Sequence, residues 1–119
     1  MERDDFRPHQ EGLWVMTLTA RMTLTGVSLI SMGSEGETIA HPADIFRAVI
    51  ASGNQRFVLI RNHPGGNPSP SPADHSITRN LREGAGILKL EFVDHLIVPT
   101  SKIPVGIDPY FSFRESGLL

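Results

Sequence analysis

Four side chains whose types could take part in chemistry stand at the two ends of one segment, "RNHPGGNPSPSPAD" (61–74). Arg61 and His63 stand at the end of an apolar run, and Ser71 and Asp74 stand where a helical pattern begins. Residues two apart on a strand share one face, so Arg61 and His63 point the same way. Imidazole nitrogen and carboxylate oxygen are zinc ligands. A catalytic zinc usually needs three protein ligands, and this loop supplies two, His63 and Asp74.

The second half of the loop also has a purely structural explanation. Serine is a favoured N-cap, proline suits the first helical position, and an acid in the first turn complements the helix dipole. Ser71, Pro72 and Asp74 therefore resemble a capping box. The same Pro-Ala-Asp unit opens an earlier helical pattern at 42–44. On this segment alone, a helix start and a metal ligand both remain open for Asp74.

The elements that must position these side chains can be predicted from hydrophobic patterning and from turn residues. Apolar runs rich in β-branched residues indicate strands, and apolar residues three to four apart indicate helices. In chain order they are a strand pair in 12–33 with a turn near 20–22, a turn at 34–37, a helix at 41–54, a strand at 55–62, a helix after the loop, a strand at 89–99 and one or two short edge strands after it.

Two helices are expected to pack against the sheet through apolar stripes. Pro42 suits the first helical position and Gly53 the C-terminal end of the earlier helix. The buried faces are predicted to be Ile45, Phe46, Val49 and Ile50 in the first helix, and Ile77, Leu81, Ala85 and Leu88 in the second. The continuous apolar run at 55–62 predicts a central strand that is covered on both faces. The order β-β-α-β-α-β-(β) predicts a mixed sheet flanked by helices, in the α/β or α+β class.

Length and composition bound the kind of protein. The 119 residues suffice for one domain, which we place at 11–119 after a flexible lead-in at 1–10. A formal net charge of −2 predicts no strong attraction to nucleic acid or to an anionic membrane. Cysteine is absent and no apolar run reaches the length of a membrane span, which favours a cytoplasmic protein.

Three segments resemble a known family: "NHPGGNPSPSPADHSITRNL", "LEFVDHLIV" and "SFRESGLL". Together they resemble the RadC-type branch of the JAB/MPN (JAMM) metalloprotease-like domains, from about Glu11 to the C-terminus. The family motif is His-x-His, then seven residues, Ser, two residues and Asp. Seven residues separate His63 from Ser71, and Asp74 follows three positions later. The resemblance implies the JAB/MPN, cytidine-deaminase-like architecture.

The resemblance also implies a role for each matching position. In active members two histidines and the aspartate hold zinc, which lowers the pKa of a bound water. A glutamate on the first strand takes the proton of that water, and the serine helps to stabilise the oxyanion. Carried over by position, Glu11 is the general base, His63 and Asp74 are zinc ligands, and Ser71 is the stabilising hydroxyl.

Arg61 departs from the family pattern, which has histidine at this position. A guanidinium stays protonated and has no lone pair to offer a cation. We therefore expect Arg61 to point into the site and pair with Asp74 or Glu11, in place of the cation. Zinc is expected at low occupancy for the same reason.

Two functional hypotheses follow. In the first, the chain is a RadC-like domain with a degenerate zinc site, little or no metallopeptidase activity and a binding role toward a protein or peptide, related to a DNA-repair family. In the second, it is a zinc-dependent peptidase or isopeptidase that uses His63, Asp74 and a substitute ligand. Direct DNA binding is expected to be weak, because the sequence has no helix-hairpin-helix segment and no excess of positive charge.

The other histidines are assigned mainly structural roles. His41 is expected to cap the first helix. His75 is expected to be exposed, with a minor chance of serving as the substitute ligand. His95, in "VDHLIV", matches a family position outside the metal motif, and we expect it to make a structural hydrogen bond.

Overall fold

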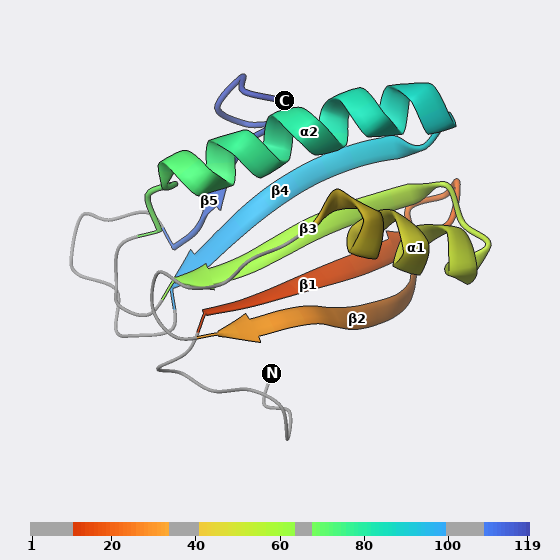
Figure 1. The fold of residues 1–119 in the computed structure, drawn as a ribbon, viewed down its shortest axis with the longest axis horizontal. Helices are drawn as coiled ribbons and strands as arrows, with labels where there is room; N and C mark the ends of the chain where they lie inside the picture. Colours follow the sequence, from red (N-terminus) through yellow and green to blue (C-terminus); the bar gives the residue numbers. More distant parts are fainter. Residues whose placement is uncertain (1–10, 34–40, 64–67, 100–108) are drawn as a thin grey trace.

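A five-stranded mixed sheet forms the body of the chain (Figure 1). The computed structural model describes residues 11–33, 41–63, 68–99 and 109–119. The strands lie in the order β2-β1-β3-β4-β5, with β3 and β4 parallel and the other pairs antiparallel. Their bounds are β1 Glu11–Leu18, β2 Leu24–Gly33, β3 Arg56–His63, β4 Glu91–Pro99 and β5 Phe111–Ser112. The predicted fold class is confirmed.

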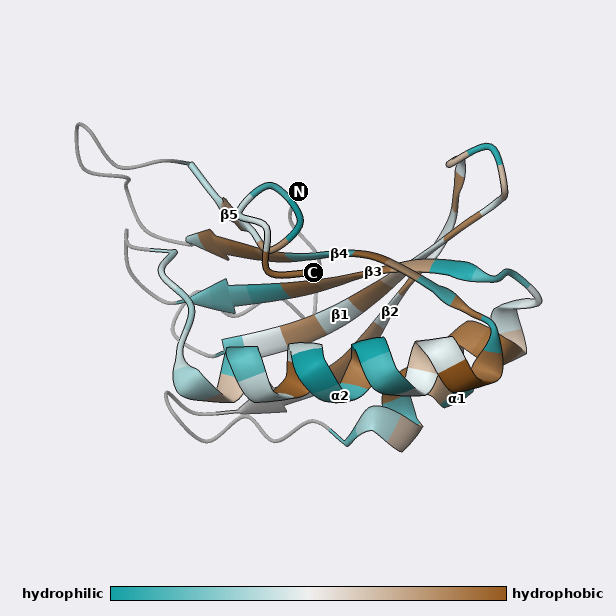
Figure 2. Cartoon of the chain, turned by 90° about the horizontal axis from the view of Figure 1, so that it is seen from above, coloured by the Kyte–Doolittle hydropathy of each residue, from teal (hydrophilic) through white to brown (hydrophobic). Residues whose placement is uncertain are grey.

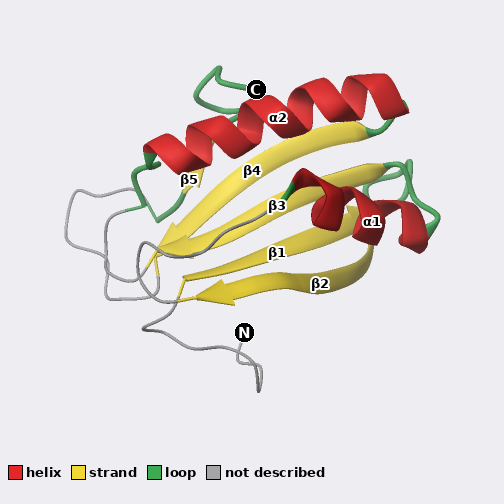
Figure 3. Cartoon of the chain, in the orientation of Figure 1, coloured by secondary structure: helices red, strands yellow, loops and turns green. Residues whose placement is uncertain are grey.

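Two helices lie on the same face of this sheet (Figures 2 and 3). They are α1, Pro42–Ser52, and α2, Pro72–Leu88, so the predicted order of elements is confirmed. Proline occupies the first turn of each helix, and the backbone at Gly53 takes a φ of 77°, which favours glycine. The core between helices and sheet is made by Leu13, Val15, Ile45, Phe46, Val49, Phe57, Leu59, Ile77, Leu81, Ala85 and Phe92.

The residues predicted to form the buried face of each helix are buried, except for the last residue of each set. Ile50 is 58% exposed and Leu88 46% exposed, whereas the earlier members of both stripes are buried. Hydrophobic periodicity gives the face of a helix but not how far along that face a neighbouring element extends. Both residues stand in the last turn of their helix, one turn beyond the point where Phe46 meets Gly84.

The central position predicted for the third strand is confirmed. β3 pairs with β1 on one side and with β4 on the other. Its consecutive residues 57–59 and 61–62 are buried, so both faces of the strand are covered. This burial explains why its sequence reads as a continuous apolar run instead of an alternation.

Several sequence predictions fall outside the described residues. They are the flexible lead-in at 1–10 and the turn at 34–37, and the loop is described only up to His63 and again from Pro68. Within the described part of the chain, no helix is both long and apolar enough to span a membrane.

Candidate functional site

Strand pairing brings the side chains of Glu11, Arg61 and His63 to one face of the sheet. β1 and β3 are antiparallel, with Leu13 opposite Arg61. Glu11 precedes Leu13 by two residues and His63 follows Arg61 by two, so all of them share the face on which the helices lie. The sequence placed Arg61 and His63 on one face correctly, and the structure adds Glu11 to that face.

Asp74 reaches the same place from the first turn of α2. The side chain of Ser71 accepts a hydrogen bond from the Asp74 amide at 3.2 Å, and Asp74 Oδ2 accepts from the Ser71 amide at 2.8 Å. The Ser71 hydroxyl also donates to Oδ2, at 2.9 Å. The predicted capping box is therefore confirmed, and it fixes the orientation of a carboxylate that is completely buried.

Arg61 extends into the site and contacts both acids. Its Nε lies 2.6 Å from Asp74 Oδ1, as an ion pair whose alignment falls short of a hydrogen bond, and its Nη1 lies 3.8 Å from Glu11 Oε2. The side chain of Arg61 is 6% exposed and that of Glu11 17% exposed. The contacts expected of Arg61 are thus present in the structure.

His63 completes the cluster by contacting the other oxygen of the same carboxylate. His63 Nε2 lies 3.1 Å from Asp74 Oδ2. Burial alone would raise the pKa of Asp74, but the hydrogen bonds from His63 and Ser71 and the charge of Arg61 outweigh it and hold that pKa far below its usual value. An ionised carboxylate only accepts hydrogen bonds, so Nε2 of His63 carries the hydrogen.

A second layer, which the loop motif does not contain, supports this cluster. The Thr78 hydroxyl donates to the backbone carbonyl of Asp74 at 2.8 Å and lies 2.7 Å from His95 Nδ1. Because the hydroxyl hydrogen is used on the carbonyl, His95 Nδ1 is the donor to Thr78. The hydrogen bond predicted for His95 is confirmed. Thr78 was missed, although its position four residues after Asp74 places it on the same helix face.

His95 is neutral at physiological pH. Burial is the main cause that lowers its pKa, to about 4, and the nearby Asp74 opposes the shift only in part. Its ring stacks on Phe113, with centroids 4.6 Å apart and planes 5° apart. Since His95 is completely buried on β4 and Phe113 follows β5, this contact ties the C-terminal segment to the sheet beside the site.

Two further histidines in the described part of the chain, His41 and His75, make no contact with Arg61 or Asp74 that helps to build the cluster. His41 is the N-cap residue of α1, as predicted, but its side chain makes no capping hydrogen bond. The ring of His75 meets Phe113 edge-on, with centroids 5.3 Å apart, and the residue is half-buried instead of exposed.

These side chains do not fit a zinc ion. The two atoms that would face the metal, His63 Nε2 and Asp74 Oδ2, bind each other, and Arg61 contacts the other carboxylate oxygen. Within the described ranges, no group of three or more His, Cys, Asp or Glu side chains is arranged to hold a metal ion. The guanidinium of Arg61, a permanent cation, contacts the same carboxylate as His63.

Comparison with known proteins identifies the family. The chain matches the RadC-like JAB domain over residues 1–118. It is 34% identical over 119 residues to a UPF0758 protein of Desulfitobacterium hafniense, which covers 100% of this chain and 46% of the relative. The chain belongs to the RadC-like JAB domain family. This confirms the resemblance inferred from the loop motif.

Further relatives match about three quarters of this chain. A UPF0758 protein of Cyanothece is 46% identical over 89 residues, which is 75% of this chain and 37% of the relative. One from Trichodesmium erythraeum is 42% identical over the same length. The RadC-like chain therefore spans less than half the length of these relatives.

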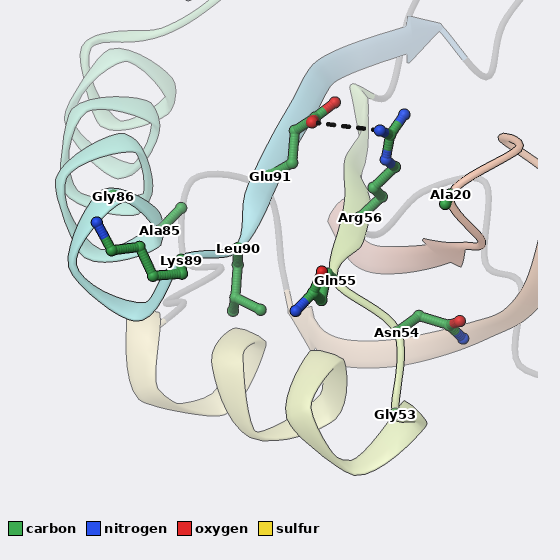
Figure 4. Close-up of a pocket in the computed structure, with 10 residues that line it drawn as sticks. All are labelled: Ala20, Gly53, Asn54, Gln55, Arg56, Ala85, Gly86, Lys89, Leu90 and Glu91. Carbon is green, nitrogen blue, oxygen red and sulfur yellow. Dashed lines mark ion pairs between the residues drawn. The ribbon is translucent and has the colours of Figure 1, made fainter.

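A cavity of about 630 Å³ lies away from the Arg61 cluster (Figure 4). Its lining comes from Ala20, the segment that follows α1, the last turns of α2 with the residues after it, and the first residues of β3 and β4. The cluster stands at the other end of β3, at its last residues. Arg56 and Glu91, which are opposite each other on β3 and β4, form an ion pair at its wall, at 3.7 Å. No residue of the cluster lines this cavity.

Proposed function

We propose that this RadC-like JAB domain has lost zinc-dependent hydrolysis and acts as a binding module for a protein or peptide. The observation that carries the proposal is the buried contact of Arg61 Nε with Asp74 Oδ1 at 2.6 Å. Without a metal ion, the buried carboxylate of Asp74 would need another positive charge beside it, and the guanidinium of Arg61 supplies that charge. The family geometry is thereby preserved without the ion.

Electrostatics opposes the return of zinc while Arg61 stays in place. A dication about 4 Å from a guanidinium would be repelled by roughly 8 kcal/mol at an effective dielectric of about 20. Binding would also have to displace the hydrogen from His63 Nε2 and break its bond to Asp74. The repulsion does not arise in a site with neutral histidine at position 61.

A polypeptide partner is the class that the family resemblance favours. Peptidase-like domains recognise extended polypeptide chains, and a surface of this kind can persist after the chemistry is lost. The net charge of −2 does not favour a polyanion as an alternative partner. We therefore assign the binding role to a protein or peptide segment.

The proposal is tested by an activity assay with zinc supplied. The chain, preincubated with zinc, is offered fluorogenic peptides and an isopeptide-linked substrate, and cleavage is followed beside a chelator-treated sample. We expect both samples to show the rate of buffer alone. The variant Arg61→His, assayed in parallel, reports whether the substrates and conditions can reveal activity in this fold.

A zinc-dependent peptidase remains the second candidate function. The observation in its favour is that His63 and Asp74, the two retained ligand positions, lie together beside Glu11 and Ser71. This function requires Arg61 to swing away and another group to complete the ligand set. Cleavage by the unaltered chain that depends on zinc and stops with a chelator would establish it over the first.

A further inference from the structure

The C-terminal segment, residues 111–119, begins beside β4 at one edge of the sheet (Figure 1). Only its first two residues form a strand, β5, which pairs with Leu96 and Ile97. The chain then turns, residues 114–118 are exposed, and Leu119 packs against the core. A segment with so little strand pairing depends on a few side-chain contacts, and such segments open more easily than the centre of a sheet.

The polar contacts of this segment converge on one short stretch of β4, residues 93–95. The Asp94 carboxylate accepts from the Ser112 hydroxyl at 2.6 Å and from the Arg114 amide at 3.0 Å. The Nε of Arg114 donates to the Val93 carbonyl at 2.6 Å. Because these bonds are grouped at one place, they are made together or broken together when the segment moves.

Phe113 is the apolar anchor of the segment, and its ring lies between β4 and the first turn of α2. The residue is completely buried. Its ring stacks on His95 of β4, with planes 5° apart, and meets the ring of His75 of α2 edge-on. His75 follows Asp74 directly in the sequence. The ring of Phe113 therefore contacts both elements beside the buried carboxylate.

The His95 ring connects this anchor to the site. Its Nδ1 lies 2.7 Å from the hydroxyl of Thr78, and that hydroxyl donates to the Asp74 carbonyl. Among the residues that the structure describes, His95 Nε2 has no hydrogen-bond partner. The Thr78 bond and the stack on Phe113 thus hold the ring. If Phe113 left, water would reach the ring and compete for the bond that joins β4 to the first turns of α2.

We propose that the C-terminal segment opens as a unit and that, while closed, it holds the first turns of α2 in place through Phe113, His95 and Thr78. Opening loosens the helix start that orients Asp74 toward Arg61. Any event that releases the segment therefore changes the order of the Arg61 cluster without touching it. This coupling is the same for a cluster that binds a peptide or a metal, so it does not rest on the function proposed above.

The test is hydrogen exchange of the whole chain, followed by NMR in urea concentrations below the unfolding transition. A segment that opens on its own gives exchange with little dependence on urea, because it exposes little surface. Three reporter amides, those of Phe113, Asp74 and Thr78, should exchange through this opening. We expect them to exchange at least tenfold faster than the amides of Val15 and Leu59 in the central strands.

Two substitutions separate this opening from global unfolding. Asp94→Ala removes the acceptor of two hydrogen bonds from the segment, so all three reporter amides should exchange about tenfold faster or more. Val49→Ala is the control, because Val49 is a core residue of α1 outside the C-terminal segment and its anchors. It should speed the exchange of Leu59, which requires global unfolding, and leave the reporter amides unchanged.

A disulfide that closes the segment gives the converse result. Leu96 and Ser112 are opposite each other, and the Phe113 amide bonds to the His95 carbonyl, so they form a non-hydrogen-bonded pair with close side chains. The chain has no cysteine, so Leu96→Cys with Ser112→Cys forms a single cross-link. In the oxidised protein the reporter amides should exchange as slowly as the central strands, and in the reduced protein they should exchange faster again.

Three results would overturn the proposal. The first is exchange of the reporter amides only through global unfolding in the unaltered chain. The second is acceleration of Phe113 alone by Asp94→Ala, with Asp74 and Thr78 unchanged, because the segment would then open without loosening α2. The third is an oxidised cross-linked protein whose reporter amides exchange as fast, relative to the central strands, as those of its reduced form.

Discussion

At the scale of the residue, Asp74 is the group on which the site depends. Its two oxygens contact Arg61, His63 and Ser71, and its backbone carbonyl accepts from Thr78. The carboxylate is completely buried, so its charge is stable only while these groups surround it. Arg61 is the one permanent cation among them.

Replacing Arg61 by methionine should therefore destabilise the fold. The change keeps much of the side-chain volume but leaves Asp74 and Glu11 without their cation, and we expect a loss of about 3 kcal/mol in the free energy of unfolding. Urea unfolding measures it. Arg47→Met is the matched control, because Arg47 pairs with Asp44 on an exposed helix face, and it should cost less than about 1 kcal/mol. Equal effects of the two changes would contradict the role of Arg61.

His95 predicts a specific dependence of stability on pH. Its pKa falls from 6.5 in the unfolded chain to about 4 in the folded chain. Between pH 4 and pH 6.5, this histidine therefore binds more protons in the unfolded chain than in the folded one. Stability should then fall as pH decreases from 6.5 to 4, by an order of 1–3 kcal/mol from this group. Asp74 affects the stability only at lower pH, because its ordinary pKa is 3.8 and folding lowers that pKa further.

The variant His95→Asn isolates this effect. The asparagine amide can still donate to Thr78 but does not titrate. We expect the unfolding free energy of the variant to depend less on pH between 6.5 and 4 than that of the parent chain. His41→Asn, at an exposed position, should keep the dependence of the parent. An unchanged slope in His95→Asn would refute the assignment.

Local sequence was enough to predict some of the side-chain contacts in the site. The capping box of Ser71 and Asp74 depends on neighbours within one helical turn, and period two placed Arg61 beside His63. Which acids Arg61 contacts, and the bond between Thr78 and His95, depend on strand register and helix placement. The sequence could name the partners of Arg61 only as alternatives.

At the scale of the element, α2 matters most, because it carries Asp74 and Thr78 to the sheet. It also packs against α1 at one close point. A Cβ added at Gly84 would lie 2.6 Å from the ring of Phe46, whereas a Cβ at Gly86 would meet nothing within 4 Å. Phe46 is 9% exposed and its ring meets Phe57 edge-on, so it has little freedom to move.

Two substitutions in this helix should have opposite effects. Gly84→Ala forces the methyl group against Phe46 and should destabilise the chain by about 1–3 kcal/mol. Gly86→Ala gains helix propensity in open space and should stabilise it by about 0.5–1 kcal/mol. Thermal or urea unfolding compares them directly. Stabilisation by both substitutions would show that the two helices do not pack closely at Gly84.

Helix ends and helix packing differ in how well sequence predicts them. Pro42, Gly53 and the Ser71 cap mark the helix boundaries through local backbone chemistry, and these predictions are confirmed. Ile50 and Leu88 continue the apolar stripes in sequence yet are exposed. Their exposure depends on where the neighbouring helix lies, which no local pattern contains.

At the scale of the whole molecule, the order of elements and the family followed from the sequence. The mixed sheet arises because a helix connects the parallel strands β3 and β4 while a tight turn connects the antiparallel strands β1 and β2. The strand order β2-β1-β3-β4-β5 required the structure. It is this order that leaves β2 at the edge and brings Glu11 beside Arg61.

The balance of charge makes a prediction for the chain as a whole. With a net charge of −2, it should bind DNA only weakly and without sequence preference. A gel-shift titration at moderate salt should show no complex at protein concentrations below about 1 µM. Submicromolar binding would contradict this prediction and favour a direct DNA-binding role.

The most direct test of the central claim is the zinc content of the chain and of Arg61→His. Each protein is incubated with zinc, dialysed and analysed for bound metal. We predict that the unaltered chain retains little zinc and that Arg61→His retains it stoichiometrically, with the zinc lost again when His63→Ala is added. Stoichiometric zinc in the unaltered chain, or none in Arg61→His, would contradict the claim that Arg61 holds the place of the metal.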